Sequence, residues 1–306
     1  MSNAIRALAA AAGILSFAVA ASAQPTELLP QPLGVTAVTI AAQKTGYAPV
    51  NGLKMYYEVY GSGGTPLVLI HGAFSAIGTS FAALIPGLAA NRQVIGVELQ
   101  GHGHTADIDR PMSLEAFADD TVSLVNSLGI EQADYFGYSN GAAVALQVVL
   151  RHPDAVRKLV FLSATYRLDG IQPGLMSGLG EMKWEMMIGS PWYDEYQTIA
   201  PNPADFPKLF AKKTAMDKQL KDIPDETIAA IQSPVLVALG DNDLPTAEHA
   251  VKMYRLLGGG GFGDTPAGLP KSQLAIIPGA SHVSVASKAN ILVPIVTEFL
   301  DRAVTN

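Results

Sequence analysis

The sequence predicts an α/β protein whose core is a doubly wound, mostly parallel β-sheet with a helical insertion. Three observations support this fold class. Short apolar segments alternate with helix-forming segments in the first half of the chain, which is typical of parallel strands covered on both faces. The alternation stops over residues 166–231 and resumes afterwards. The chain of 306 residues is long enough for one large domain with an insertion of this size.

The composition excludes several classes of function. The chain has 20 Lys and Arg residues against 27 Asp and Glu residues, a formal net charge of −7 at pH 7, so we expect no nucleic-acid partner. It contains no cysteine, which rules out disulfides, thiolate catalysis and cysteine-bound metal ions.

The first 23 residues have the layout of a secretory signal peptide. Arg6 precedes an uncharged and largely apolar stretch from Ala7 to Ala20, and small residues stand at the end of this segment, before a cleavage site after Ala23. The apolar stretch is shorter than the about 20 residues that span a bilayer. We therefore expect cleavage, export to the periplasm or the medium, and no stable membrane anchor.

The first half of the core is expected to alternate strands with helices. Residues 24–46 contain three prolines and no periodicity, and we interpret them as an N-terminal arm or linker. The core then extends over residues 47–165. Its expected strands are residues 53–60, 67–70, 94–97, 133–136 and 159–162, and its expected helices are residues 79–90, 114–128 and 142–150. Ser113 before the second helix, with Glu115 in its first turn, is a typical N-cap pattern.

The second half of the core follows the insertion. Residues 166–231 contain no clear buried strand and are rich in Met, Trp, Tyr, Pro and Lys, so we expect short helices and loops that form a lid. The core resumes over residues 232–306. Its expected strands there are residues 233–240 and 273–277, and its expected helices are residues 247–257 and 286–303.

Residues 137–141 have the sequence Gly-Tyr-Ser-Asn-Gly, which matches the G-x-S-x-G pattern of a nucleophile elbow. They lie between an expected strand and an expected helix, as this turn requires. The sharp turn strains the backbone of Ser139 so that its hydroxyl projects into a cleft. Side chains at positions 137 and 141 would collide across the turn, which explains the two glycines. We therefore predict that Ser139 is a catalytic nucleophile.

Ser139 needs a base, and the base needs an acid that orients it. In this kind of sheet the order along the chain is serine, acid, histidine, which leaves His249 and His282 as candidate bases. We predict His282, because it follows the last expected strand, whereas His249 lies inside an expected helix. Asp241 and Asp243 both follow a buried strand. Asp243 is favoured because the acid must lie a few residues beyond the strand to reach the histidine, and Asp241 is the alternative.

Two backbone N–H groups are expected to bind the oxyanion that forms during attack. One belongs to Asn140, which follows the nucleophile at the start of its helix. The other belongs to Ala73, in the loop after the strand of residues 67–70, with Phe74 as the alternative. His71 comes too early in the chain to be the base and is expected to bond the backbone of this loop.

Together these segments resemble the α/β-hydrolase fold superfamily, and within it the lid-bearing serine hydrolases of the carboxylesterase-like branch. The resemblance extends from about residue 49 to the C-terminus. It is carried by residues 71–72, 98–105, 137–141, 240–243 and 279–282. It implies a sheet of the eight-stranded type, and we expect neither a cofactor nor a bound metal ion.

The segment of residues 98–105 departs from the family pattern, which usually is Asp-x-Arg-Gly-x-Gly-x-Ser. Gln100 takes the place of the arginine, so we expect a salt bridge of the family to be missing, with consequences for stability more than for chemistry. His102 and His104 invite a metal site, but the resemblance places them in a structural turn, and we expect no metal ion there.

Apolar side chains are expected to surround the substrate. The predicted substrate-binding residues are Phe74, Tyr138, Met182, Trp184, Met187 and Trp192. Methionine adapts to irregular apolar ligands, although each of these residues can equally pack the insertion onto the core. The preferred substrate is a small, neutral and moderately hydrophobic carboxylic ester.

Other activities fit the same residues. A lactonase, a lipase, an amidase or a C–C bond hydrolase would use the same triad, and a perhydrolase or cofactor-free oxidoreductase would share the fold. A binding protein with vestigial turnover is disfavoured, because a pure binder does not need the strained turn. The sequence makes no prediction of the oligomeric state.

Overall fold

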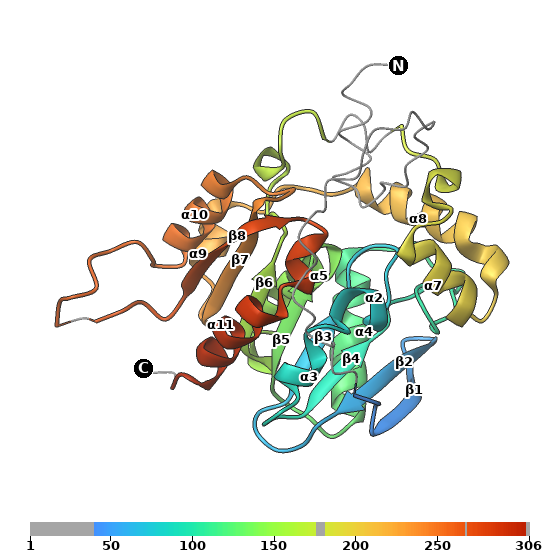
Figure 1. Cartoon of the computed structure of the whole chain (residues 1–306), viewed down its shortest axis with the longest axis horizontal. Helices are drawn as coiled ribbons and strands as arrows, with labels where there is room; N and C mark the ends of the chain where they lie inside the picture. The colour runs from blue at the N-terminus through green and yellow to red at the C-terminus, as the bar shows by residue number, and fades with distance from the viewer. Residues whose placement is uncertain (1–39, 176–180, 267, 304–306) are drawn as a thin grey trace, which may run out of the picture.

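The structure is a computed structural model that describes residues 40–175, 181–266 and 268–303 (Figure 1). The predicted signal peptide, residues 1–23, lies outside the described residues, as does the predicted arm up to residue 39. In the described part of the chain, no helix has the length and apolar character that crossing a membrane requires.

The centre of the molecule is an eight-stranded sheet with the strand order β1-β2-β4-β3-β5-β6-β7-β8. Its strands are β1 Lys44–Val50, β2 Leu53–Tyr60, β3 Leu67–Ile70, β4 Val94–Val97, β5 Ala133–Tyr138, β6 Val156–Leu162, β7 Val235–Asn242 and β8 Gln273–Ser281. β1 and β2 are antiparallel to their neighbours, and the other pairs are parallel. The predicted mostly parallel, doubly wound sheet is confirmed.

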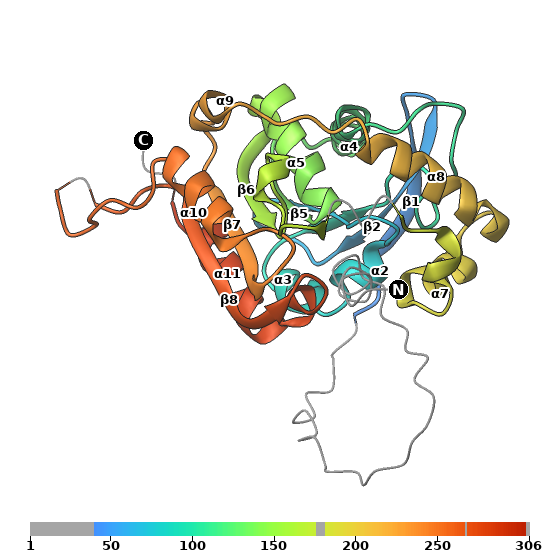
Figure 2. The same ribbon diagram turned by 90° about the horizontal axis from the view of Figure 1, so that it is seen from above.

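Helices cover both faces of this sheet (Figure 2). The core helices are α2 Ile77–Phe81, α3 Ile85–Leu88, α4 Leu114–Ser127, α5 Asn140–Arg151, α10 Ala247–Leu256 and α11 Ala289–Asp301. Side chains of α4, α5 and α10 join the apolar cluster on one face, and those of α2, α3 and α11 join the cluster on the other. The sheet is therefore the middle one of three layers.

Strand β3 shows why the central strands are apolar throughout. All four of its residues are fully buried. Val68 and Ile70 belong to the cluster with α4 and α5, whereas Leu67 and Leu69 belong to the cluster with α2 and α11. Successive side chains of a strand point to opposite faces, so a strand that is covered on both sides needs an unbroken apolar run.

Two elements depart from the prediction in more than the exact position of their ends. β1 begins at Lys44, inside the predicted arm, and its residues alternate only weakly between exposed and buried. Gly46 and Pro49 obscure the strand pattern there, which an edge strand tolerates. The helix predicted over residues 79–90 is split into α2 and α3, because Pro86 fits the first turn of a helix and not its interior.

The insertion between β6 and β7 is helical. Within the described residues its α-helices are α7 Pro191–Ile199, α8 Phe206–Asp217 and α9 Asp225–Ala229. An isolated bridge between Ile171 and Pro245 joins it to the loop after β7. Side chains of α7 and α8 reach the same cavity as residues that follow β5 and β6, so this part of the insertion lies over the carboxyl ends of the strands.

Gln100 occupies the position where the family resemblance leads us to expect arginine, and its amide bridges two charged residues. Its Nε2 donates to Asp107 Oδ1 at 2.7 Å, and its Oε1 accepts from Arg110 at 2.6 and 2.9 Å. Asp107 also pairs with Lys208 and Lys212 of α8, at 2.6 and 2.8 Å. The turn is therefore tied to α8 by ion pairs although it lacks the arginine.

Candidate active site

The turn between β5 and α5 holds Ser139 in a strained conformation. Ser139 has φ 55° and ψ −122°, a combination that residues with a side chain rarely adopt. A Cβ added to Gly137 would overlap the backbone of Gly141 and Ala142, and one added to Gly141 would overlap the carbonyl oxygen of Ile70. Both positions therefore require glycine, and the turn presents the serine hydroxyl at the carboxyl end of β5.

Gly141→Ala is expected to destabilise the fold strongly. The added methyl group meets backbone atoms of Ile70 and His71, which cannot move without disturbing β3. Overpacking of this kind costs about 1–3 kcal/mol, and sometimes more. Thermal unfolding measures the loss, with Gly261→Ala as the control because a Cβ there meets nothing within 4 Å. Equal melting temperatures for the two variants would contradict the close packing of the turn.

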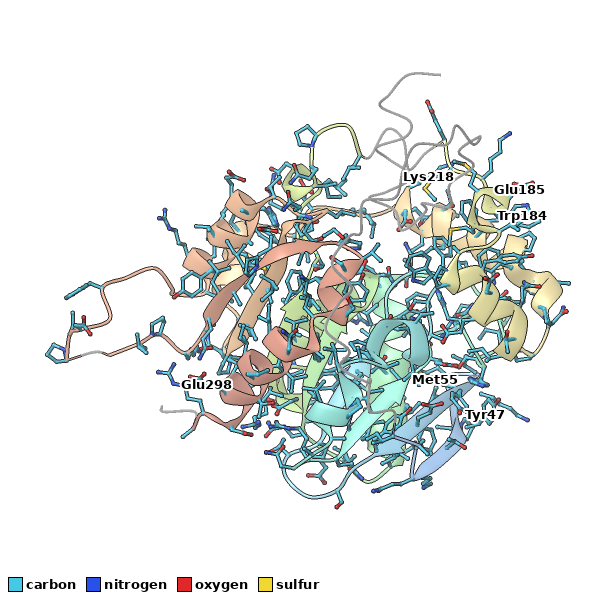
Figure 3. All side chains as sticks on the ribbon, viewed as in Figure 1. Tyr47, Met55, Trp184, Glu185, Lys218 and Glu298 are labelled. Carbon is cyan, nitrogen blue, oxygen red and sulfur yellow. The ribbon has the colours of Figure 1, made fainter. Side chains whose placement is uncertain are left out.

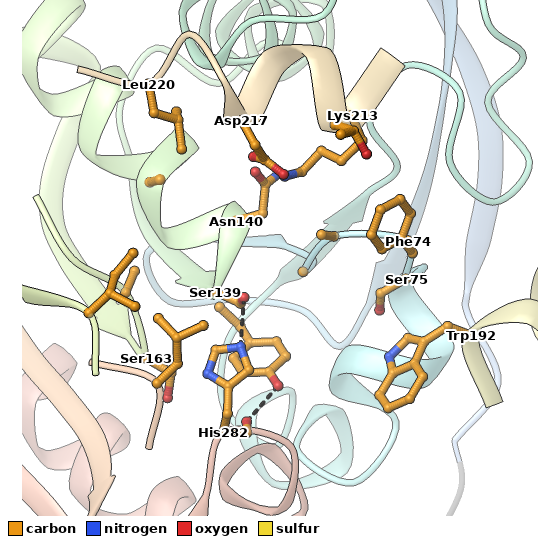
Figure 4. Close-up of a pocket in the computed structure, with 18 of the residues that line it drawn as sticks. Phe74, Ser75, Ser139, Asn140, Ser163, Trp192, Lys213, Asp217, Leu220 and His282 are labelled. Atoms are coloured by element: carbon orange, nitrogen blue, oxygen red, sulfur yellow. Dashed lines mark hydrogen bonds and ion pairs between the residues drawn. The ribbon is translucent and has the colours of Figure 1, made fainter. Parts of the chain in front are cut away.

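Three side chains that follow three strands form one chain of hydrogen bonds. Ser139 Oγ lies 2.9 Å from His282 Nε2 (Figure 4), and His282 Nδ1 lies 2.7 Å from Asp243 Oδ1. The three residues come at the ends of β5, β7 and β8, which are parallel strands, so their carboxyl ends share one edge of the sheet. This is the arrangement of a nucleophile, a base and an orienting acid.

Asp243 has hydrogen-bond donors besides His282. Its Oδ2 accepts from Ser163 Oγ at 2.6 Å and from Gly240 N at 2.9 Å, and its Oδ1 accepts from Leu244 N at 2.6 Å. Burial raises the pKa of Asp243, but the hydrogen bond and charge of His282, with the bonds from Ser163 and Gly240, outweigh it and leave the pKa below its usual value. The carboxylate is therefore ionised at neutral pH and able to orient the imidazole.

Sequence reasoning does not single out Ser163. This buried residue follows β6, has φ 58°, and donates its N–H to Ala238 O at 2.8 Å. Its hydroxyl thereby points to the acid from the neighbouring strand. The signal that identifies it is a small polar residue directly after a central apolar strand, at the edge where the other site residues gather.

The alternative acid and the alternative base have structural roles. Asp241 is exposed, and its carboxylate accepts from Gly279 N at 2.9 Å and Ala280 N at 3.1 Å, which lowers its pKa. It therefore joins the ends of β7 and β8. His249 is buried against Tyr166, whose N–H donates to its Nε2 at 3.3 Å. That contact fixes α10 against the start of the insertion.

The predicted oxyanion donors lie beside the nucleophile. Ala73 and Asn140 line the same cavity as Ser139. Asn140 is the first residue of α5, so its N–H has no acceptor within the helix. In the other loop, the N–H of Gly72 already donates to Ser80 Oγ at 3.2 Å. The Gly72 N–H is therefore already used, and the next N–H in that loop, the one that the prediction assigns to the oxyanion, belongs to Ala73.

A polar network joins the insertion to the loop that carries Ala73. Glu195 of α7 accepts from Thr79 N at 3.0 Å and from Thr79 Oγ1 at 2.5 Å. Thr79 Oγ1 lies 2.8 Å from Ser75 Oγ, which lies 2.5 Å from Ser80 Oγ. Through these hydroxyl groups, one carboxylate of the insertion is linked to the backbone of the loop that carries Ala73.

Glu195→Gln is expected to change how stability depends on pH. Burial raises the pKa of Glu195, and the hydrogen bonds from Thr79 only partly oppose the shift. The carboxyl group therefore contributes stability below its usual pKa of 4.5, and this contribution is lost as the pH rises through the pKa of the folded protein. Denaturant unfolding from about pH 5 to 8 should show the wild type losing stability relative to the variant. A difference that stays constant with pH would contradict this.

A cavity of about 300 Å³ opens over Ser139. Of the predicted substrate-binding residues, those that line it are Phe74, Tyr138, Met182, Met187 and Trp192. Tyr138 also donates its hydroxyl to the carbonyl of His282 at 2.7 Å, which helps to hold the histidine loop.

Trp184 is not part of the cavity lining and corrects the predicted set. It is the first residue of a short 3₁₀ helix, Trp184–Met187, and packs on the apolar cluster of the core. Figure 3 shows it beside Glu185, toward the outside of the insertion. Only the far end of this short helix, at Met187, turns toward the cavity. In so short a helix, the spacing of the apolar residues in the sequence does not indicate which of them faces the cavity.

The comparisons with known proteins agree with the observed fold. A family model described as the alpha/beta hydrolase fold matches residues 65–185, which include the Ala73 loop and the elbow. A solved serine hydrolase involved in carbazole degradation superposes with a TM-score of 0.66, covering 84% of this chain and 98% of that chain at 20% identity. The protein has the α/β-hydrolase fold.

Curated proteins that are similar to this chain carry different names. The 2-hydroxymuconate semialdehyde hydrolase of Pseudomonas sp. (strain CF600) is 32% identical over 38% of this chain and 46% of its own length. The pimeloyl-[acyl-carrier protein] methyl ester esterase of Neisseria meningitidis is 26% identical over 76% of this chain and 92% of its own length. The chain spans less than half the length of the first curated relatives it matches, 38% of one and 46% of the next.

The early histidines of the chain have structural contacts. His71 Nδ1 donates to the carbonyl of the next residue at 2.8 Å, and its Nε2 accepts from Leu99 N at 3.1 Å. His102 is buried with its Nδ1 on a backbone carbonyl at 3.0 Å, and His104 Nδ1 lies 3.0 Å from Glu98 Oε2. Among the residues that the structure describes, no group of three His, Asp or Glu side chains is arranged to hold a metal ion.

Proposed function

We propose that this α/β-hydrolase is a serine hydrolase that cleaves a neutral, moderately hydrophobic carboxylic ester through an acyl-enzyme intermediate. The observation that carries the proposal is the chain of hydrogen bonds from Ser139 through His282 to Asp243, which opens onto a largely apolar cavity. A serine hydroxyl becomes a nucleophile when a base takes its proton, and the base works when an acid orients it.

In the proposed mechanism, His282 accepts the proton of Ser139 as Oγ attacks the ester carbonyl. The N–H groups of Asn140 and Ala73 stabilise the oxyanion. His282 then protonates the leaving alcohol. A water molecule deprotonated by the same imidazole attacks the acyl-enzyme, and the imidazolium returns this proton to Ser139 Oγ as the carboxylic acid leaves. Asp243 stays ionised and stabilises the imidazolium that forms in each half of the cycle.

The cavity supports a small and mainly apolar substrate. Its volume of about 300 Å³ lies at the lower end of the range of small-molecule sites, about 300–1,000 Å³. Met182, Met187 and Trp192 of the insertion form an apolar wall. The Neisseria relative that is named as a methyl ester esterase supports the ester class, because the match with it covers most of both chains.

Labelling with a fluorophosphonate tests the catalytic role of Ser139. The reagent phosphonylates a serine only where a base and an oxyanion site activate it, so we expect one label per chain, at Ser139. The Ser139→Ala variant is the control and should take up none. Labelling at another residue, or none in the wild type, would remove the proposal. A binding protein with vestigial turnover would release product slowly after one round and retain the ligand.

A substrate panel tests the bond that is cleaved. Lactonase, lipase, amidase and C–C bond hydrolase activities all fit the same three side chains, and the names of the relatives include more than one hydrolase type. We expect short and medium-chain alkyl esters to give the highest kcat/KM, above lactones, long-chain glycerides, amides and β-diketones. A higher kcat/KM for any of those four classes would replace the ester proposal by that activity.

A further inference from the structure

One end of the cavity is polar although most of its lining is apolar. Lys213 and Asp217 of α8 line this end together with Asn140 of α5. In Figure 4 the three side chains lie together on the side of Ser139 that faces away from His282. A substrate bound to the nucleophile therefore has one direction in which it meets polar groups.

Two charged residues at this end, Lys213 and Asp217, neutralise each other, and Lys218, which also lines the cavity, follows them at the end of α8. Lys213 and Asp217 are one helical turn apart, and Lys213 Nζ lies 2.5 Å from Asp217 Oδ1. The lysine side chain is 6% exposed, so its ammonium group depends on this partner. A carboxylate on the substrate would have to displace Asp217 and would face its negative charge. Beside this ion pair, a neutral ligand group is therefore favoured over an anionic one.

The third residue has a hydrogen-bond donor without an acceptor. Asn140 Nδ2 is buried and bonds to none of the described residues. A side-chain amide has two N–H donors, and a buried donor without an acceptor carries a free-energy penalty. Figure 4 shows the Asn140 side chain pointing toward Lys213 and Asp217, along the cavity. A hydrocarbon at this place would keep the penalty, whereas an oxygen acceptor would remove it.

We propose that the substrate of this site is an ester that carries a second, neutral hydrogen-bond acceptor, such as a ketone or ether oxygen, which Asn140 Nδ2 binds. The Lys213–Asp217 pair closes this end of the cavity. The inference rests on the proposed function, because attack by Ser139 sets where the ester group lies. The Asn140 side chain is short and its backbone N–H is the proposed oxyanion donor. The second acceptor therefore lies only a few bonds from the ester carbonyl.

The test uses methyl octanoate and its 4-oxo, 5-oxo and 6-oxo derivatives, with a parallel set in which an ether oxygen is moved along the alcohol chain. The readout is kcat/KM of each oxygen-bearing ester divided by that of its parent. We expect one position with a ratio of about 3 to 10 in the wild type, which is the effect of one hydrogen bond. In Asn140→Ala, which keeps the backbone N–H, the ratio should fall to about 1.

Two controls make the result specific to Asn140. Thr214→Val removes a different polar group of the cavity lining on α8 and should keep the wild-type ratio. Monomethyl suberate carries a carboxylate instead of the neutral oxygen and should react more slowly than methyl octanoate. The inference is overturned if every ratio is about 1, if the preference persists in Asn140→Ala, or if the carboxylate ester is the better substrate.

Binding to Ser139→Ala separates this inference from the proposed function. Calorimetric titration with the same esters measures their affinities without turnover, and the preferred oxygen-bearing ester should bind about 3 to 10 times more tightly than its parent. If that preference is present while the wild type hydrolyses no ester, the acceptor site stands and the esterase proposal fails. If esters are hydrolysed without any such preference, the acceptor site fails and the esterase proposal stands.

Discussion

Ser139→Ala is expected to lower kcat for ester hydrolysis by about 10⁴-fold or more. The substitution removes the nucleophile, whereas the N–H groups of Ala73 and Asn140 and the cavity remain. The residual rate should therefore be what the oxyanion donors and substrate binding supply without covalent catalysis. Initial rates with the best ester of the panel measure the loss in kcat, and KM should change little because the cavity lining is retained.

A matched serine variant controls for this measurement. Ser62 lies exposed in the turn between β2 and β3, and Ser62→Ala should keep the wild-type kcat. Equal melting temperatures of Ser139→Ala and the wild type would exclude unfolding as the cause of the loss. The acyl-enzyme mechanism is contradicted if purified Ser139→Ala keeps more than about 1% of the wild-type kcat.

Asp243→Asn is expected to have the second largest effect, a loss in kcat of about 10³- to 10⁴-fold. The amide cannot stabilise an imidazolium as a carboxylate does, and its N–H₂ group would favour the wrong tautomer of His282. It also presents donors to Ser163 Oγ and Gly240 N, which bond to the carboxylate in the wild type. Steady-state kinetics together with thermal unfolding separate the catalytic loss from the structural one.

The same substitution two residues earlier is the control. Asp241 bonds to backbone N–H groups at the end of β8 and does not contact His282, so Asp241→Asn should keep most of the wild-type kcat and lower the melting temperature slightly. Combining Asp243→Asn with Ser139→Ala should add little to the loss from Ser139→Ala alone, because the residues act as one unit. A large loss in Asp241→Asn with little in Asp243→Asn would reverse the assignment of the acid.

The central sheet is predictable from the sequence because its strands are buried on both faces. β3 and β4 are short, wholly apolar runs, and their predicted bounds agree with the structure. The bounds of β1 are not predictable in this way, because β1 lies at the edge of the sheet. Its exposed positions, with Gly46 and Pro49, remove the apolar pattern there. The break between α2 and α3 depends on Pro86, whose meaning for a helix is decided by its position within the turn.

The site is predictable where residues follow strand ends and unpredictable where distant residues support them. Ser139, Asp243 and His282 each come after a recognisable strand, so the sheet topology alone brings them together. Ser163 and Glu195 act through partners 80 and 116 residues away, and single-residue patterns do not reveal such pairs. The tertiary contact, and not a local propensity, determines their positions.

Helix α8 is held against the core by two kinds of contact that respond oppositely to dissolved ions. The exposed Lys208 pairs with Asp107, and the Phe210 ring stacks on Phe74 with centroids 5.2 Å apart, next to Ala73, the proposed oxyanion donor. Chloride at high ionic strength screens the first contact, whereas sulfate also strengthens the second by its exclusion from apolar surface. Rates measured in the two salts at one ionic strength should therefore differ, and the choice of buffer anion becomes part of describing this protein's kinetics.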